Sequence, residues 1–126
     1  MSELHRVLVV EDDTDIRETM IEVLADAGYQ AVGARDGVEA LAQLRGPEDR
    51  WCLVLLDLMM PNMDGRTFRA EQLRDPTLSP IPVIIVSALS DTGEDAEELQ
   101  VAAHLTKPVP LEDLVEVVDR FCPRAA

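Results

Sequence analysis

The stretch Val7-Leu8-Val9-Val10-Glu11-Asp12-Asp13 joins four consecutive apolar residues to three consecutive acids. An uninterrupted apolar run of this length is typical of a strand that is buried on both faces of a sheet. Two similar runs lie at 53–56 and 83–86, and weaker strand candidates lie at 30–34 and 104–106. The opening stretch therefore predicts the first strand of a parallel sheet, and it places carboxylates where that strand ends.

Segments with a helical period separate the five strand candidates. The first carries Ile16, Met20, Val23, Leu24 and Ala27 on one face and closes at Gly28. The second is capped at Asp36, carries its apolar face as far as Leu44 and ends before Pro47. The third opens at Asp64-Gly65 and stops before Asp75-Pro76. The fourth has a thin apolar face and extends from Asp91 to Ala103, and the last runs from Pro110 to Phe121. Strict alternation of strand and helix predicts an α/β fold, in which helices cover both faces of a parallel sheet.

Length and composition predict one domain. The chain has 126 residues, of which 47% are apolar and 29% are charged, and we expect a single domain over 1–126 with its core in 5–122. A net charge of -14 argues against nucleic acid or an anionic bilayer as a partner. The first residues have neither the length nor the pattern of a signal peptide or membrane span, so we expect a cytoplasmic protein.

The two cysteines, Cys52 and Cys122, lie 70 positions apart. They have no CxxC spacing and no neighbouring pair of histidines. This pattern predicts neither a zinc site nor a disulfide, and the simplest interpretation is two buried or incidental thiols.

Polar groups follow the strand candidates at the edge where a doubly wound sheet binds its ligands. Glu11, Asp12 and Asp13 follow the first run, Asp57 follows the second, Ser87 the third, and Lys107, the single lysine, follows the last strand. Two carboxylates 4 Å apart repel by about 4 kcal/mol at an effective dielectric near 20. A hard dication such as Mg²⁺, or a proton, would relieve that repulsion.

Each of these residues also has an ordinary structural explanation. Acids after a strand often cap the next helix, a lone serine is commonly a turn hydroxyl, and a Lys-Pro pair can be a solvated loop. The functional interpretation rests on all of them together, each at its own strand end.

In order along the chain, the motifs Val9-Val10-Glu11-Asp12-Asp13, Asp57-Leu58-Met59-Met60-Pro61-Asn62-Met63-Asp64-Gly65, Val86-Ser87-Ala88 and Lys107-Pro108 resemble the receiver domain of bacterial two-component response regulators. The resemblance covers about residues 5 to 122. It implies a chemotaxis-regulator-like, flavodoxin-like sheet of five parallel strands in the order 2-1-3-4-5, with five helices.

The resemblance also implies roles for individual residues. Asp57 would be the phosphoacceptor; Mg²⁺ would be held by Glu11, Asp12, Asp57 and the carbonyl of Met59; Asp13 would cap the following helix. The phosphoryl group would be contacted by Ser87, Ala88 and Lys107, and His104 occupies the switch position that is usually Tyr or Phe. A histidine at that position predicts a pH-biased switch.

The implied function is a cytoplasmic phosphoprotein of a two-component phosphorelay. It takes a phosphoryl group from a sensor histidine kinase or a histidine phosphotransfer protein, and then switches an interaction face toward a downstream protein target or a second copy. It is a switch rather than a turnover enzyme. Met59 and Leu89, which are apolar, predict slow self-dephosphorylation. The segment from Ser87 to Lys107 is shorter than in typical relatives, which predicts a short or frayed fourth helix.

Other functions remain as alternatives. They include a phosphorelay intermediate and a pseudo-receiver that serves only for docking. A flavodoxin-like flavin carrier needs a phosphate-cradling loop where this chain has three acids, and an aspartate-dependent phosphatase usually places its nucleophile on the first strand.

Overall fold

The sheet has five parallel strands. The computed structural model describes residues 6–46, 51–57, 63, 65–87, 101–107 and 109–122. The strands are β1 (Arg6–Val10), β2 (Gln30–Ala34), β3 (Trp51–Asp57), β4 (Val83–Ser87) and β5 (Ala103–Thr106). They are ordered β2-β1-β3-β4-β5, and every neighbouring pair is parallel. The predicted strand order is confirmed.

The described helices are α1 (Thr14–Asp26), α2 (Gly37–Leu44), α3 (Gly65–Arg74) and α5 (Leu111–Phe121). Asp13 caps α1 by accepting a hydrogen bond from the Ile16 amide at 3.0 Å, and Asp36 caps α2 by accepting one from the Glu39 amide at 2.8 Å. These caps satisfy amides that have no partner within the helix. Gly28 follows the end of α1 and has a φ of 101°, a left-handed conformation that favours glycine.

The predicted fourth helix lies almost entirely outside the described residues, and so does the expectation that it is short. Its last predicted residue, Ala103, belongs instead to β5, which begins one residue earlier than the sequence indicated. Ala103 pairs in register with Ile84 of β4. Strand pairing with a buried neighbour therefore overrides the helical pattern at this position.

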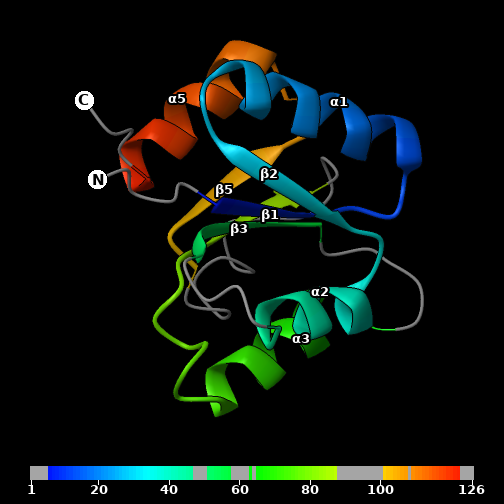
Figure 1. Ribbon diagram of the computed structural model, residues 1–126, viewed down its shortest axis with the longest axis vertical. Helices are drawn as coiled ribbons and strands as arrows, with labels where there is room; N and C mark the ends of the chain where they lie inside the picture. Colours follow the sequence, from blue (N-terminus) through cyan, green and yellow to red (C-terminus); the bar gives the residue numbers. More distant parts are fainter. Residues whose placement is uncertain are drawn as a thin grey trace.

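The helices cover the two faces of the sheet in pairs, so that the fold has three layers (Figure 1). On one face, α1 and α5 bury Leu24, Leu114 and Val118 against Val7, Val9, Leu53, Leu55 and Ile84. On the other face, α2 and α3 bury Leu41 and Phe68 against Leu8, Val10, Val54 and Leu56. Alternate residues of each strand thus enter different cores, which explains the uninterrupted apolar runs.

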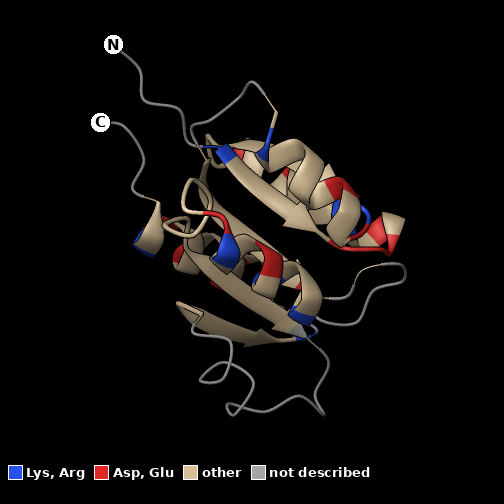
Figure 2. Cartoon of the chain, turned by 90° about the horizontal axis from the view of Figure 1, so that it is seen from below, with Lys and Arg blue, Asp and Glu red and all other residues tan. Residues whose placement is uncertain are grey.

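Charged residues lie mainly on the helices and at strand ends, while the strands themselves are largely uncharged (Figure 2). In the part of the chain that the structure describes, no helix combines the length and apolar character needed to cross a bilayer.

The prediction for the two cysteines is wrong. Cys52 and Cys122 form a disulfide, with their Cα atoms 5.6 Å apart. Cys52 lies near the start of β3, and Cys122 directly follows α5. The fold brings the end of α5 over the start of β3, an approach that a 70-residue separation in sequence does not reveal.

Candidate cation and phosphoryl-transfer site

The register of β1 against β3 places two carboxylates side by side. Val10 pairs with Leu56, so the next residues, Glu11 and Asp57, lie together at the carboxyl ends of these strands. Only 2% of Glu11 and 4% of Asp57 are exposed. The Glu11 amide donates to the carbonyl of Ala34 at 2.9 Å, which continues the pairing of β1 with β2 by one residue. The backbone of Glu11 is therefore held by the sheet.

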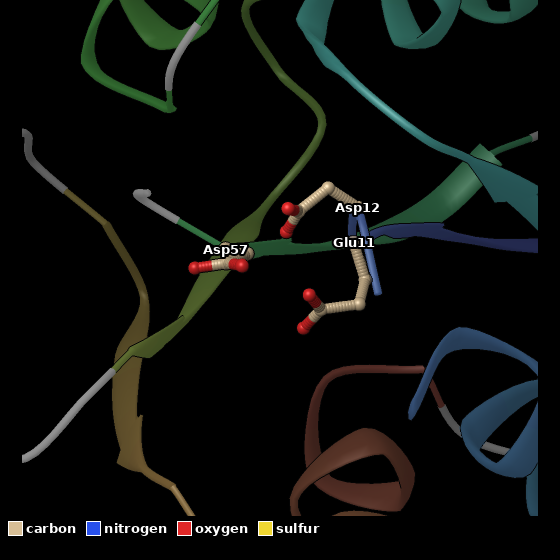
Figure 3. A group of neighbouring side chains, drawn as sticks. All are labelled: Glu11, Asp12 and Asp57. Atoms are coloured by element: carbon tan, nitrogen blue, oxygen red, sulfur yellow. The ribbon is translucent and has the colours of Figure 1, made fainter. Parts of the chain in front are cut away.

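Asp12 completes an acidic cluster with these two residues. One carboxylate oxygen from each of Glu11, Asp12 and Asp57 lies within 4.8 Å of the others, and the three side chains converge from β1 and β3 (Figure 3). Mg²⁺ binds oxygen ligands at about 2.0–2.1 Å, so oxygens around one ion lie roughly 3 to 4 Å apart. The cluster fits such an ion after shifts of an ångström or less. Asp12 is exposed, which leaves an open side for solvent or substrate.

Lys107 reaches into this cluster from the residue that follows β5. Its Nζ lies 2.6 Å from Glu11 Oε1 and 3.2 Å from Asp57 Oδ2. The ammonium thus bridges the two buried carboxylates, and its own side chain is 25% exposed. A partly exposed lysine has a flexible side chain, so the ammonium of Lys107 can shift toward negative charge that is added to Asp57.

The electrostatics of the cluster favour a proton on Glu11. The pKa of Glu11 is raised to about 7: burial raises it most and the neighbouring Asp57 adds to this, while the hydrogen bonds from Lys107 and the Asp13 amide lower it. Burial lowers the pKa of Lys107, but the hydrogen bond to Glu11 and the charges of Asp57 and Glu11 outweigh that effect and raise it overall. The site therefore holds the Lys107 ammonium beside a carboxyl group that is only partly ionised near pH 7.

Two supporting contacts were not expected from the sequence. Arg17 of α1 donates from Nη1 to the carbonyl of Glu11 at 2.8 Å. The Gly37 amide, at the start of α2, donates to the carbonyl of Met63 at 3.1 Å, in the segment between β3 and α3. A Cβ on Gly37 would lie 2.8 Å from that carbonyl oxygen. The pattern Asp36-Gly37 signalled a helix start, but nothing in it indicated this close approach.

The other predicted site residues are placed only in part. Ser87 is the last residue of β4 and pairs with Thr106, so its backbone lies at the same sheet edge as Asp57. His104 is half-buried in β5, in register with Ile85. Met59 and Ala88, together with Leu89, lie outside the described residues.

A doubly wound sheet with an acidic, lysine-bridged cluster at its carboxyl edge defines an α/β domain built to bind a cation and, beside it, an anionic group. Residues 7–119 match the model of the response regulator receiver domain family. The chain belongs to this family, and it is a phosphoacceptor receiver domain. The match favours that function over a docking module alone. Receiver domains generally bind Mg²⁺, and membership implies an interaction with histidine kinases.

Named sequence relatives of the chain are also response regulators or transcriptional regulatory proteins. The chain is 36% identical over 117 residues to the transcriptional regulatory protein PdtaR of Mycobacterium tuberculosis, covering 90% of this chain and 55% of that protein. It is 38% identical over 112 residues to the response regulator MprA of Mycobacterium avium, covering 87% of this chain and 47% of MprA. The chain therefore spans about half the length of these relatives.

Two solved structures show the same fold. The response regulator receiver protein of Pseudomonas putida superposes with a TM-score of 0.85 at 32% identity, covering 95% of this chain and 98% of that one. The phosphorylated cyanobacterial phytochrome response regulator RcpA superposes with a TM-score of 0.77 at 32% identity, covering 96% of each chain.

Proposed function

We propose that Asp57 is the residue that accepts the phosphoryl group, from a phosphohistidine of a sensor histidine kinase or a histidine phosphotransfer protein. The observation that carries the proposal is the placement of Asp57: it is buried at the end of β3, and its Oδ2 lies 3.2 Å from the ammonium of Lys107. The similar protein RcpA has been seen in a phosphorylated form. Asp12, which is exposed, is less enclosed than an acceptor shielded from water should be.

In the reaction, an Asp57 carboxylate oxygen forms a bond to phosphorus while the bond from phosphorus to the histidine nitrogen breaks, and the imidazole leaves. Glu11, Asp12, Asp57 and the carbonyl of Met59 would hold Mg²⁺. The ion, when bound, supplies positive charge near the phosphoryl oxygens. Lys107 supplies a second positive charge from the side of β5, and a short shift would transfer its hydrogen bond from Asp57 to the phosphoryl group.

Three further residues complete the proposal. Ser87, the last residue of β4, and Ala88, which follows it in the sequence, would contact the phosphoryl group once it is attached. His104 would be the switch residue, and protonation of its imidazole would bias the switch toward one state at low pH. The domain would act as a cytoplasmic switch that loses its phosphoryl group slowly, and its output would be a changed protein-interaction face, with dimerisation as one outcome.

Phosphorylation by a small phosphoryl donor, followed by intact mass, tests the acceptor. Wild type should gain the mass of one phosphoryl group in the presence of Mg²⁺ and little without it. Asp57→Asn should gain none, whereas Asp26→Asn, which changes an exposed acid at the end of α1, should behave as wild type. A full gain of mass by Asp57→Asn would refute the assignment.

The same assay separates the switch proposals from the acceptor. The half-life of the phosphorylated form, followed by mass after removal of the donor, should be long compared with seconds. Partner binding by the phosphorylated form should depend more strongly on pH in wild type than in His104→Phe, which keeps the pH dependence that comes from Glu11. Equal pH responses of both proteins would exclude His104 while leaving Asp57 unaffected.

A further inference from the structure

The end of α5 is held to the sheet by a clasp that lies far from the acidic cluster. The clasp consists of the Cys52–Cys122 disulfide and the Tyr29 hydroxyl. The hydroxyl donates to the carbonyl of Cys122 at 2.8 Å, and it also contacts the carboxylate of Asp119. Tyr29 and Cys122 are 3% and 1% exposed. One covalent and one polar connection therefore fasten the last turn of α5.

The two cysteines of the clasp differ in how far they are buried. Cys122 is buried, whereas Cys52 is half-buried, so we expect an incoming thiolate to attack Cys52 rather than Cys122. Thiol–disulfide exchange depends on such access, and exposed disulfides are the labile ones. The sequence predicts a cytoplasmic location, where the disulfides that do form are mostly transient, catalytic or redox-sensing.

We propose that Cys52 and Cys122 form a reversible redox site, opened by a dithiol and closed by a low-molecular-weight disulfide, which controls how firmly the end of α5 is held. In opening, a thiolate of the dithiol attacks Sγ of Cys52, the protein S–S bond breaks, and Cys122 leaves as a thiolate that takes a proton. The second thiol of the dithiol, as a thiolate, then attacks the dithiol sulfur that is bonded to Cys52. Cys52 leaves as a thiolate that takes a proton. The protein pair gains two electrons and two protons, and the dithiol becomes a disulfide.

The redox site acts on a different element from the one that binds phosphate. Cys52 and Asp57 lie five positions apart on β3, a distance of about 17 Å along an extended strand. Reduction leaves the β1–β3 register and the Lys107 contacts in place. It removes the covalent half of the clasp, and the hydrogen bond from Tyr29 and the packing of Val118 against the sheet then hold the end of α5. The inference does not rest on the identity of the phosphoacceptor.

Hydrogen exchange of the full chain, oxidised and reduced, tests the proposal. Loss of the cross-link lowers global stability, which speeds exchange of all core amides by a common factor. Amides in the last turn of α5 should lose about tenfold or more protection beyond that factor, because they gain a local opening. Tyr29→Phe keeps the disulfide and is the matched control, and it should retain the full redox difference. The apparent Mg²⁺ affinity should stay within about twofold.

Reaction with a monothiol such as glutathione identifies the sulfur under attack. Peptide mapping should find the adduct on Cys52 in wild type without denaturant. An adduct on Cys122, a disulfide that resists dithiols in the folded protein, or an equal loss of protection in α5 and β1 would each overturn the proposal. So would two free thiols after purification under oxidising conditions. The comparison uses oxidised and reduced wild type, so it needs no cysteine variant.

Discussion

Acidification should weaken Mg²⁺ binding through protonation of Glu11. The pKa of Glu11 is raised to about 7, chiefly by burial, so this ligand is neutral in a large share of metal-free molecules near neutral pH. A protonated carboxyl is a poor Mg²⁺ ligand, and the ion must displace the proton. The ionised fraction falls from about nine tenths at pH 8 to about one tenth at pH 6. The apparent affinity should fall about tenfold across that interval, close to 1.4 kcal/mol.

Isothermal titration calorimetry measures both the affinity and the protons released. Titrations at pH 7 in buffers of different ionisation enthalpy should show release of about half a proton for each Mg²⁺ bound. Glu11→Gln should bind more weakly and lack the Glu11 part of the pH dependence. Glu18→Gln, which neutralises an exposed acid of α1, should keep the wild-type profile. Equal affinities at the two pH values, with no proton release, would refute this account of the site.

Other predictions concern stability. Glu11 keeps its proton up to about pH 7 in the folded protein, whereas the unfolded chain releases it near pH 4.5. The free energy of unfolding of the metal-free protein should therefore fall by about 3 kcal/mol as the pH rises between those values. Glu11→Gln should not show this fall. Lys107→Met removes a hydrogen bond that lowers the pKa of Glu11, so that pKa should rise. The loss of stability should then extend to higher pH than in wild type. Gly37→Ala places a methyl 2.7 Å from the Met63 side chain, and urea unfolding should show a loss of about 1–3 kcal/mol. Reduction of the disulfide, which closes a loop with a separation of 70, should cost about 4 kcal/mol of unfolding free energy by the chain-entropy model. Urea unfolding checks all four. An unchanged urea midpoint on raising the pH, in Gly37→Ala or after reduction, or an unchanged pH of that loss in Lys107→Met, would contradict the corresponding contact.

The local patterns of the chain were sufficient to predict most of the architecture. An unbroken apolar run such as Val7–Val10 indicates burial on both sides, and an Asp36-Gly37 pair followed by Glu39 indicates a capped helix, because both signals depend on neighbours within a few residues. The limit of such signals is visible at Ala103, where a helical period continued into a residue that pairs with β4.

The acidic cluster was also foreseeable from strand ends, since the carboxyl ends of parallel strands meet at one edge. What the sequence could not supply was the environment of each acid. Glu11 and Asp12 are adjacent in sequence, yet one is buried against Lys107 and the other is exposed. The raised pKa of Glu11 follows from that burial, and burial depends on everything that packs around the residue.

Strands, helix caps and the set of acids at the sheet edge were thus determined by the sequence alone, because short-range geometry dictates them. The tertiary structure alone decided the pairing of Cys52 with Cys122, the approach of Gly37 to Met63, and the bridge from Lys107 to Glu11 and Asp57. Each of these joins residues at least 26 positions apart, and contacts over such separations arise only when the helices have packed on the sheet.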